Sequence, residues 1–124
     1  MSQIFIVASS LLGFLGVAVG AFGAHALKQQ LSPEMLTIFE TGARYHLIHA
    51  AVLLGIGILA QNRDSKAIKV SGFAMIFGII VFSGSLYALA VSGIRIFGAI
   101  TPIGGLSFLV GWACLLYTSP SPRD

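Results

Sequence analysis

Ionisable side chains are scarce in this sequence, and the residues that could do chemistry gather in a few short stretches. The candidates are His25, Glu40, Arg44, His46, His49, Arg95 and Thr101. Glu40 and Arg44 are spaced i,i+4, so on a helix they can form an ion pair. We interpret them as an interfacial ion pair, with a proton relay as the alternative. His46 and His49, spaced i,i+3, share another face, roughly opposite that pair.

The histidines raise the question of a metal site. Imidazole is a common ligand, and His46 and His49 could bind a metal together with His25. Without a fixed third ligand, however, two histidines at i,i+3 are more typical of hydrogen bonds to neighbouring helices. The sequence also lacks a complete nucleophile–base or ligand constellation. We therefore expect no catalytic residue, metal or cofactor, and no enzymatic activity.

Four apolar runs must position these side chains. The first, Ile4 to Leu27, contains no Asp, Glu, Lys or Arg. At 1.5 Å per residue, roughly 20 apolar residues cross a hydrocarbon layer of ~30 Å. We therefore predict an all-α bundle of four transmembrane helices in a single domain, residues 1–116. The helices are expected at about 4–27, 33–60, 67–91 and 101–116, followed by an irregular tail, 117–124.

Local signals define two helix starts. Ser32 is a suitable N-cap, Pro33 suits the first helical position, and Glu34 complements the helix dipole. In the last span, Pro102 removes a backbone hydrogen bond and clashes with the preceding turn. We therefore expect the regular helix to begin at Thr101 or Pro102, with residues 96–100 as an irregular lead-in.

Composition points to the lipid bilayer as the main partner. Hydrophobic residues make up 56% of the chain and charged residues 9%, against about 25% charged in soluble proteins. The basic residues form no cluster interleaved with aromatics, so no nucleic-acid partner is expected. Arg63, Lys66 and Lys69 lie in or beside the second loop. Under the positive-inside rule, this places both termini in the cytoplasm.

The first span has a second interpretation. Ala24-His25-Ala26 fits the A-x-A pattern of signal-peptide cleavage sites. The apolar run is longer than the usual 7–15 residues of a signal peptide, and no Lys or Arg precedes it. We prefer a retained, permanent span.

Small residues form a stripe on the first span. The stripe comprises Gly13, Gly16, Gly20 and Gly23, at alternating spacings of three and four. Such stripes let another helix backbone approach closely. Packing inside the bundle is preferred to a homodimer interface. The third span carries a similar stripe, made of Ser71, Met75, Gly78, Phe82, Ser85, Leu89 and Ser92. A contact between the first and third spans is therefore predicted.

Chain order brings the candidate polar residues to one end of the bundle. The ends of spans one and three and the starts of spans two and four must share a side. We therefore expect His25, Glu40, Arg44, His46, His49 and Arg95 to line one polar region at the non-cytoplasmic end. An unpaired Arg at membrane depth costs at least ~2.5 kcal/mol. Arg44 is thus expected to bind Glu40 or the carbonyl groups near Thr101 and Pro102.

Several strings carry a resemblance to a known family. They are GAFGAHAL at 20–27, TGARYH at 41–46 followed by His49, FSGSLYAL at 82–89, and GAITPIGG at 98–105 closing on Gly111-Trp112. Over about residues 4–116 the chain resembles the uncharacterised small membrane proteins called DUF423 or UPF0382, whose animal relatives are called transmembrane protein 256. The resemblance implies an inner or plasma membrane protein with four helices and no established catalytic residue. The family continues the last span with apolar residues, whereas Tyr117-Thr-Ser-Pro departs from that pattern. That tail also resembles a translated adapter, so a native tail and a replaced C-terminus are both open interpretations of residues 117–124.

The preferred function is a non-enzymatic structural or assembly component of the bacterial inner membrane, because the loops are too short to build a water-facing active site. A homo-oligomer or another membrane protein is a possible partner. The alternative is a small transporter or channel that uses the polar cluster, since ionisable groups at membrane depth often mark ion paths. An enzyme acting on a lipid or quinone is the least favoured interpretation.

Overall fold

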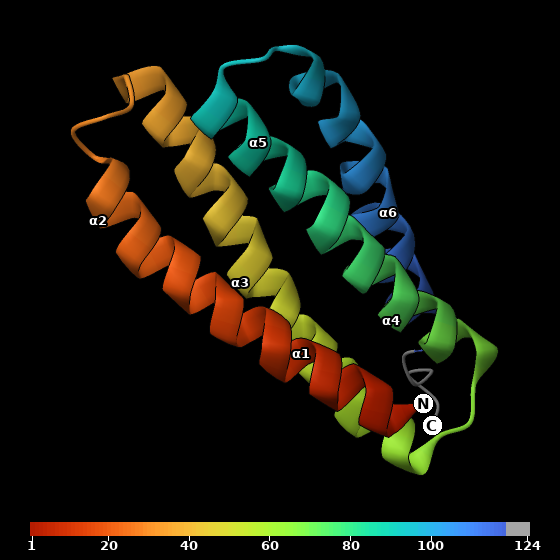
Figure 1. The fold of residues 1–124 in the computed structure, drawn as a ribbon. Helices are drawn as coiled ribbons and strands as arrows, with labels where there is room; N and C mark the ends of the chain where they lie inside the picture. The colour runs from red at the N-terminus through yellow and green to blue at the C-terminus, as the bar shows by residue number, and fades with distance from the viewer. Residues whose placement is uncertain (119–124) are drawn as a thin grey trace.

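Four long helices run side by side along one axis in the computed structural model, which describes residues 1–118 (Figure 1). The first span is α1 (Ser2–Val17), η1 (Ala18–Gly23) and α2 (Ala24–Leu27), and the second is α3 (Pro33–Asn62). The third is α4 (Lys66–Gly78), η2 (Ile79–Ser83) and α5 (Gly84–Ser92), and the fourth is α6 (Ile96–Thr118). All four are long and apolar enough to cross a membrane. The predicted all-α fold of four membrane-spanning helices is confirmed.

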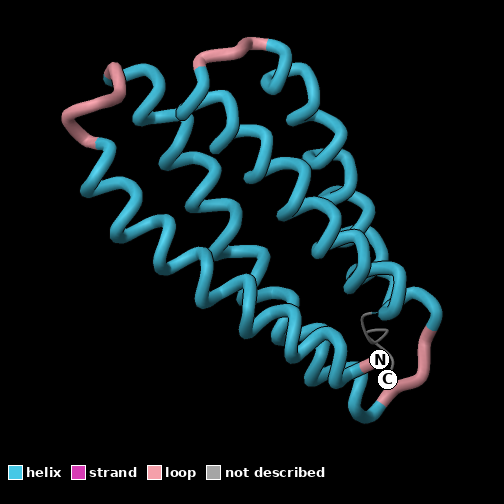
Figure 2. The backbone as a smooth tube through the Cα atoms, viewed as in Figure 1, coloured by secondary structure: helices cyan, strands magenta, loops and turns pink. Residues whose placement is uncertain are grey.

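Short turns join the spans (Figure 2). Ser32 caps α3 as predicted, because its hydroxyl accepts a hydrogen bond from the Met35 backbone N–H at 3.2 Å, and Pro33 is the first helical residue. Ser65 caps α4 in the same way through Ile68 N–H at 3.4 Å. α5 ends at Gly93, whose φ of 73° lies in the left-handed region that favours glycine. The turns therefore hold adjacent spans antiparallel.

α6 starts earlier than the sequence indicated. It begins at Ile96, so the expected irregular lead-in at 96–100 is wrong, and Pro102 lies inside the helix. Proline removes only the hydrogen bond to the Gly98 carbonyl, near an end where water or lipid head groups can supply a donor. α6 also continues to Thr118, so Tyr117 is helical. The rest of the expected irregular tail, 119–124, lies outside the described residues.

The glycine stripe packs inside the bundle, as preferred, but not against the predicted partner. α1 and η1 pack mainly on α3 rather than on the third span. A Cβ on Gly16 would approach the Leu47 side chain, one on Gly20 the Ala43 methyl group, and one on Gly23 the Phe39 ring. Gly13 has no such neighbour within 4 Å of a Cβ. The stripe therefore fixes the approach of the first two spans.

The stripe of the third span packs on α6. The Ser71 hydroxyl donates a hydrogen bond to the Gly111 carbonyl at 2.8 Å. Gly104 packs directly against Phe82, and the Phe82 backbone occupies the space that a Cβ at position 104 would need. The main interfaces are α1 with α3 and α4–α5 with α6. The predicted contact between spans one and three is made by Phe5, whose ring packs on Gly72 and Phe73, rather than by the two stripes.

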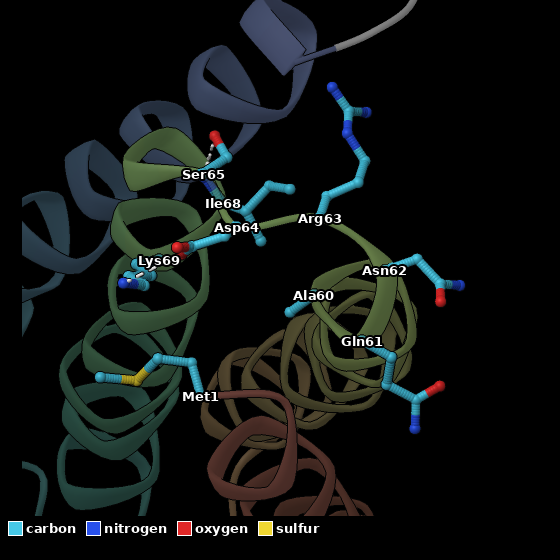
Figure 3. A pocket seen from close by; sticks show the side chains of 9 residues that line it. All are labelled: Met1, Ala60, Gln61, Asn62, Arg63, Asp64, Ser65, Ile68 and Lys69. Atoms are coloured by element: carbon cyan, nitrogen blue, oxygen red, sulfur yellow. Dashed lines mark hydrogen bonds and ion pairs between the residues drawn. The ribbon is translucent and has the colours of Figure 1, made fainter.

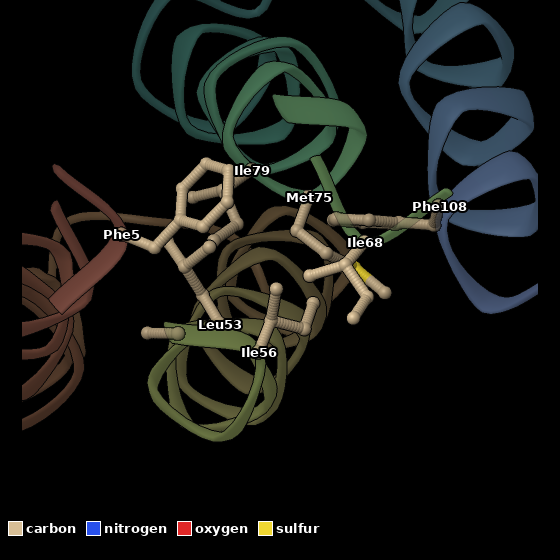
Figure 4. Packing of buried hydrophobic residues seen from close by; sticks show 8 residues of the cluster. Phe5, Leu53, Ile56, Ile68, Met75, Ile79 and Phe108 are labelled. Atoms are coloured by element: carbon tan, nitrogen blue, oxygen red, sulfur yellow. The ribbon is translucent and has the colours of Figure 1, made fainter. Parts of the chain in front are cut away.

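The hydrophobic core lies between α1, α3, α4 and α6 (Figure 4). Its buried members are Phe5, Ala50, Leu53, Ile56, Ile68, Met75, Ile79 and Phe108. In lipid such packing gains van der Waals contact rather than hydrophobic free energy. The core holds α3 at the centre of the bundle, where the candidate histidines lie.

Candidate functional site

Two histidines lie near the middle of α3. The helix contains 30 residues between Pro33 and Asn62, so its midpoint falls between Leu47 and Ile48. His46 and His49 flank that midpoint, and each is 5% exposed. Ionisable residues at this depth are rare and usually face the interior of a bundle.

His46 joins α3 to two other spans. Its Nε2 atom is 2.8 Å from the Leu12 carbonyl oxygen in α1, and its Nδ1 atom is 2.9 Å from the Tyr87 hydroxyl oxygen in α5. A carbonyl can only accept, so Nε2 carries the proton and donates it. Nδ1 is then free to accept from the Tyr87 hydroxyl. His46 therefore carries a proton on Nε2 and links three helices, and as a neutral imidazole it accepts at Nδ1 from the Tyr87 hydroxyl.

His49 is hydrogen-bonded in the opposite sense. Its Nδ1 atom is 2.7 Å from the Tyr45 carbonyl oxygen, and its Nε2 atom is 3.1 Å from the indole nitrogen of Trp112 in α6. The indole N–H can only donate, so Nε2 accepts and Nδ1 carries the proton. The His49 ring also stacks on Phe108, with centroids 3.7 Å apart. His49 is thus a neutral Nδ1–H imidazole that joins α3 to α6.

The side of α3 that carries His46 is tightly packed. The Ser83 hydroxyl donates to the Gly42 carbonyl at 2.7 Å, which ties η2 to α3. A Cβ on Gly42 would lie 2.9 Å from the Tyr87 ring, and one on Gly16 would lie 3.2 Å from the His46 ring. We call this the closed side of α3.

The side of α3 that carries His49 is open. α6 packs on the third span and makes no comparable backbone contact with α3. Aromatic side chains bridge the gap and leave a groove of about 380 Å³. The groove is lined by Arg44, Tyr45, Ile48, His49, Phe82, Gly105, Phe108, Leu109 and Trp112. Trp112 is 45% exposed, so this open side faces the surroundings of the bundle.

Comparison with known proteins identifies the family. The model of the family described as "Protein of unknown function (DUF423)" matches residues 19–105. The chain belongs to the DUF423 family. It is 45% identical to a UPF0382 membrane protein of Staphylococcus saprophyticus, covering 92% of this chain and 94% of the relative. No solved structure matches this chain.

Two further relatives carry membrane names. The UPF0382 membrane protein YwdK of Bacillus subtilis is 38% identical, over 92% of this chain and 94% of its own length. The UPF0382 inner membrane protein YgdD of Escherichia coli is also 38% identical, over 93% of this chain and 88% of its own length. This DUF423 chain is accordingly an integral membrane protein of a family whose biochemical function is unknown, as the sequence indicated.

Arg44 does not have the partner that the sequence predicted. Glu40 and Arg44 are both exposed on α3, and no ion pair joins them. Within residues 1–118 the guanidinium also makes no hydrogen bond to a carbonyl near Thr101 or Pro102. Exposed i,i+4 pairs gain only ~0.3–0.5 kcal/mol, too little to hold two long side chains together. The expected internal partner of Arg44 is therefore wrong, and this cation remains at the edge of the groove.

The other predicted polar residues of this DUF423 chain do not form one site. The turns at 28–32 and 93–95 lie at the same end of the bundle, opposite the N-terminus (Figure 1). His25 and Arg95 are exposed there, and their side chains make no hydrogen bonds to other described residues. Thr101 instead lies 2.6 Å from the Ser85 hydroxyl, between α5 and α6. The structure therefore separates exposed charges from buried hydrogen-bonded groups.

The histidines do not converge on a metal. His46 and His49 turn towards different helices, and His25 lies near the end of the first span. No three His, Cys, Asp or Glu side chains in the described part of the chain are placed to hold a metal ion together.

Basic residues surround the opposite end of the bundle. A pocket of about 410 Å³ lies at the α3–α4 turn (Figure 3). Lys69 pairs with Asp64 at 3.3 Å there, and the Arg63 guanidinium donates to the Thr118 carbonyl at 2.9 Å. The polar side chains come from the α3–α4 turn and from the helix ends beside it, so this pocket is a surface hollow around the turn.

Three partners in the site were not predicted from the sequence of this DUF423 member. Tyr87 and Trp112 were not among the predicted site residues, yet they hydrogen-bond the two histidines. Leu12 contributes only its carbonyl oxygen, which no residue type could indicate. The π-helical segments η1 and η2 also left no sequence signal that we recognised.

Proposed function

We propose that this protein is a non-enzymatic structural component of the bacterial inner membrane, and that its central histidines fasten helices rather than carry protons. One observation carries the proposal. In the described part of the chain, no buried side-chain nitrogen or oxygen atom lacks a hydrogen-bond partner. A transport path needs polar groups that can exchange partners with a cargo or with water. Here the buried polar groups are engaged within the protein, several of them between helices.

The two histidines illustrate this role. Both ring nitrogens of His46 are bound to other spans, and those of His49 are bound to Tyr45 and Trp112. Proton uptake by His49 would turn its Nε2 atom into a donor and break the bond to the Trp112 indole N–H, whereas a protonated His46 would require the Tyr87 hydroxyl to reverse its role and accept. Such an arrangement favours a fixed scaffold. A second copy of the chain or another membrane protein would bind this scaffold through α1 and α6, whose membrane-spanning segments are the least buried of the four.

Ion flux into proteoliposomes tests the proposal against a transporter or channel. Purified protein is reconstituted with a pH-sensitive dye inside, and a potassium gradient with valinomycin drives proton entry. We expect the same dye response as in protein-free liposomes. Flux that requires the protein and is abolished in His46→Leu or Glu40→Gln would overturn the scaffold and support transport through the polar residues.

The orientation is part of the proposal. Arg63, Lys66 and Lys69 surround the α3–α4 turn, and basic loops stay in the cytoplasm. Both termini are then cytoplasmic in the inner membrane, the location printed in the name of the Escherichia coli relative. Single cysteines at Asn62 and Gln30, in a Cys114→Ser background, provide the test. We expect an impermeant maleimide to label Gln30→Cys alone in intact spheroplasts. Labelling of Asn62→Cys there would contradict the orientation.

A further inference from the structure

We propose that the groove between α3 and α6 binds one anionic phospholipid, with its phosphate at Arg44 and an acyl chain along the aromatic wall. The groove has one charged side chain, Arg44, and its other lining residues are mainly apolar and aromatic. This division matches an amphiphile with one negative group and a hydrocarbon chain. Lipid binding neither requires nor excludes transport, so the inference goes beyond the proposed function and stands independently of it.

Arg44 lies where a lipid phosphate can reach it. It is the twelfth residue of α3, so its Cα lies roughly 16 Å along the helix from Pro33, at 1.5 Å per residue. Side chains on a helix lean towards its N-terminus, which on α3 is the end with the 28–32 turn (Figure 1). The guanidinium thus extends from membrane depth towards the nearer head groups, as snorkelling arginines do.

The charge of the Arg44 guanidinium has no counter-charge in contact with it within the described residues. No hydrogen bond or ion pair joins the Arg44 side chain to another described residue, and Glu40 does not line the groove. A cation at this depth is costly without a partner. A phosphate is well suited to the role, because guanidinium groups bind its oxygen atoms in a bidentate manner.

The aromatic wall supplies the place for an acyl chain. On α6 the lining runs from Gly105 to Trp112, seven residues or about 10 Å along the helix. Gly105 lies beside the Phe82 ring and adds no side chain of its own, so the groove stays open beside Arg44. Below it lie Phe108 and the half-exposed Trp112. A chain that descends from a phosphate at Arg44 would therefore contact the Trp112 indole.

Trp112 is the only tryptophan in the sequence, so all tryptophan fluorescence comes from this one position at the groove. The protein is reconstituted in bilayers with one fixed ratio of phosphatidylglycerol to phosphatidylcholine. In one series the phosphatidylglycerol carries dibrominated acyl chains, and in the other the phosphatidylcholine does. Bilayer charge is then identical, and only the position of the quencher changes. We expect brominated phosphatidylglycerol to quench more strongly, with a relative association about fivefold higher, the factor equivalent to ~1 kcal/mol for one basic residue at a lipid surface.

Two variants make the result specific. Arg44→Gln should reduce the fivefold preference to about one. Arg95→Gln, which removes an exposed charge at the same end of the bundle, should retain it. Equal quenching by the two lipids in the wild type would overturn the proposal. So would a preference that survives Arg44→Gln, or one that both variants lose equally, since the latter would indicate general surface attraction.

Discussion

The closed and open sides of α3, which lie next to each other because His46 and His49 are spaced i,i+3, use the same residue type in different surroundings. His46 and His49 lie three residues apart, are equally buried, and each accepts one hydrogen bond and donates another. On the closed side, His46 binds two other spans, and glycines let the helices approach. On the open side, His49 binds one other span through Trp112, beside a groove that also contains Arg44.

The closed side holds the bundle together, whereas the open side presents an accessible surface. Where backbones approach closely, a histidine can bridge helices with both nitrogens, and no space remains for a ligand. Where bulky aromatics keep helices apart, the same residue supports a wall whose outer surface is accessible. Burial and residue type alone would have assigned both histidines the same role.

Replacement of His46 should have the largest effect on stability. His46→Leu removes two hydrogen bonds between helices and leaves the Tyr87 hydroxyl without its acceptor. We expect a loss of about 2 kcal/mol in the free energy of unfolding, because bonds between membrane helices average ~0.6 and reach ~1.7 kcal/mol each. SDS titration of the protein in mixed micelles measures it. His25→Leu, at an exposed position, should change little; equal losses in the two variants would contradict the role of His46.

A matched pair of glycines tests how tightly each side is packed. On the closed side, a Cβ at Gly42 would lie 2.9 Å from the Tyr87 ring, so Gly42→Ala should cost about 1–2 kcal/mol through overpacking. On the open side, a Cβ at Gly105 would lie 3.7 Å from Phe82, an ordinary contact. Gly105→Ala should therefore be neutral or slightly stabilising. The same titration compares them, and the reverse order would show that the closed and open sides are misassigned.

Replacement of His49 should have a smaller effect. His49→Leu removes one bond between helices, since its other bond goes to Tyr45 on the same helix. We expect a loss of about 0.6–1 kcal/mol, from the range for single bonds in membrane bundles. A double-mutant cycle with Trp112→Phe isolates the pair. A coupling energy near zero would indicate that the His49–Trp112 bond contributes nothing to stability.

The sequence predicted the spans because their signals are local. An uncharged run long enough to cross a bilayer is visible in the residues themselves, as is the Ser32–Pro33 start of α3. The glycine stripe likewise predicted a close helix approach. It could not identify the neighbour, because spacing describes one helix and the partner depends on how all four pack.

The candidate site was less predictable for the same reason. The residue types of His46 and His49 indicated hydrogen bonds between helices, but their partners come from α1, α5 and α6, including a backbone carbonyl. Glu40 and Arg44 had the spacing of an ion pair, yet spacing only permits the contact. In the structure both side chains are exposed and do not pair, which spacing alone could not reveal. That leaves Arg44 available at the groove.

The central claim is that both histidines are neutral and join helices, with the proton on a different ring nitrogen in each. Their tautomers test this claim. Protein labelled with ¹⁵N-histidine in lipid nanodiscs can be measured by NMR, with His46→Leu and His49→Leu used for assignment. The geometry predicts an Nε2–H tautomer for His46 and an Nδ1–H tautomer for His49 at neutral pH. A shared tautomer, or a doubly protonated ring at either position, would contradict the account.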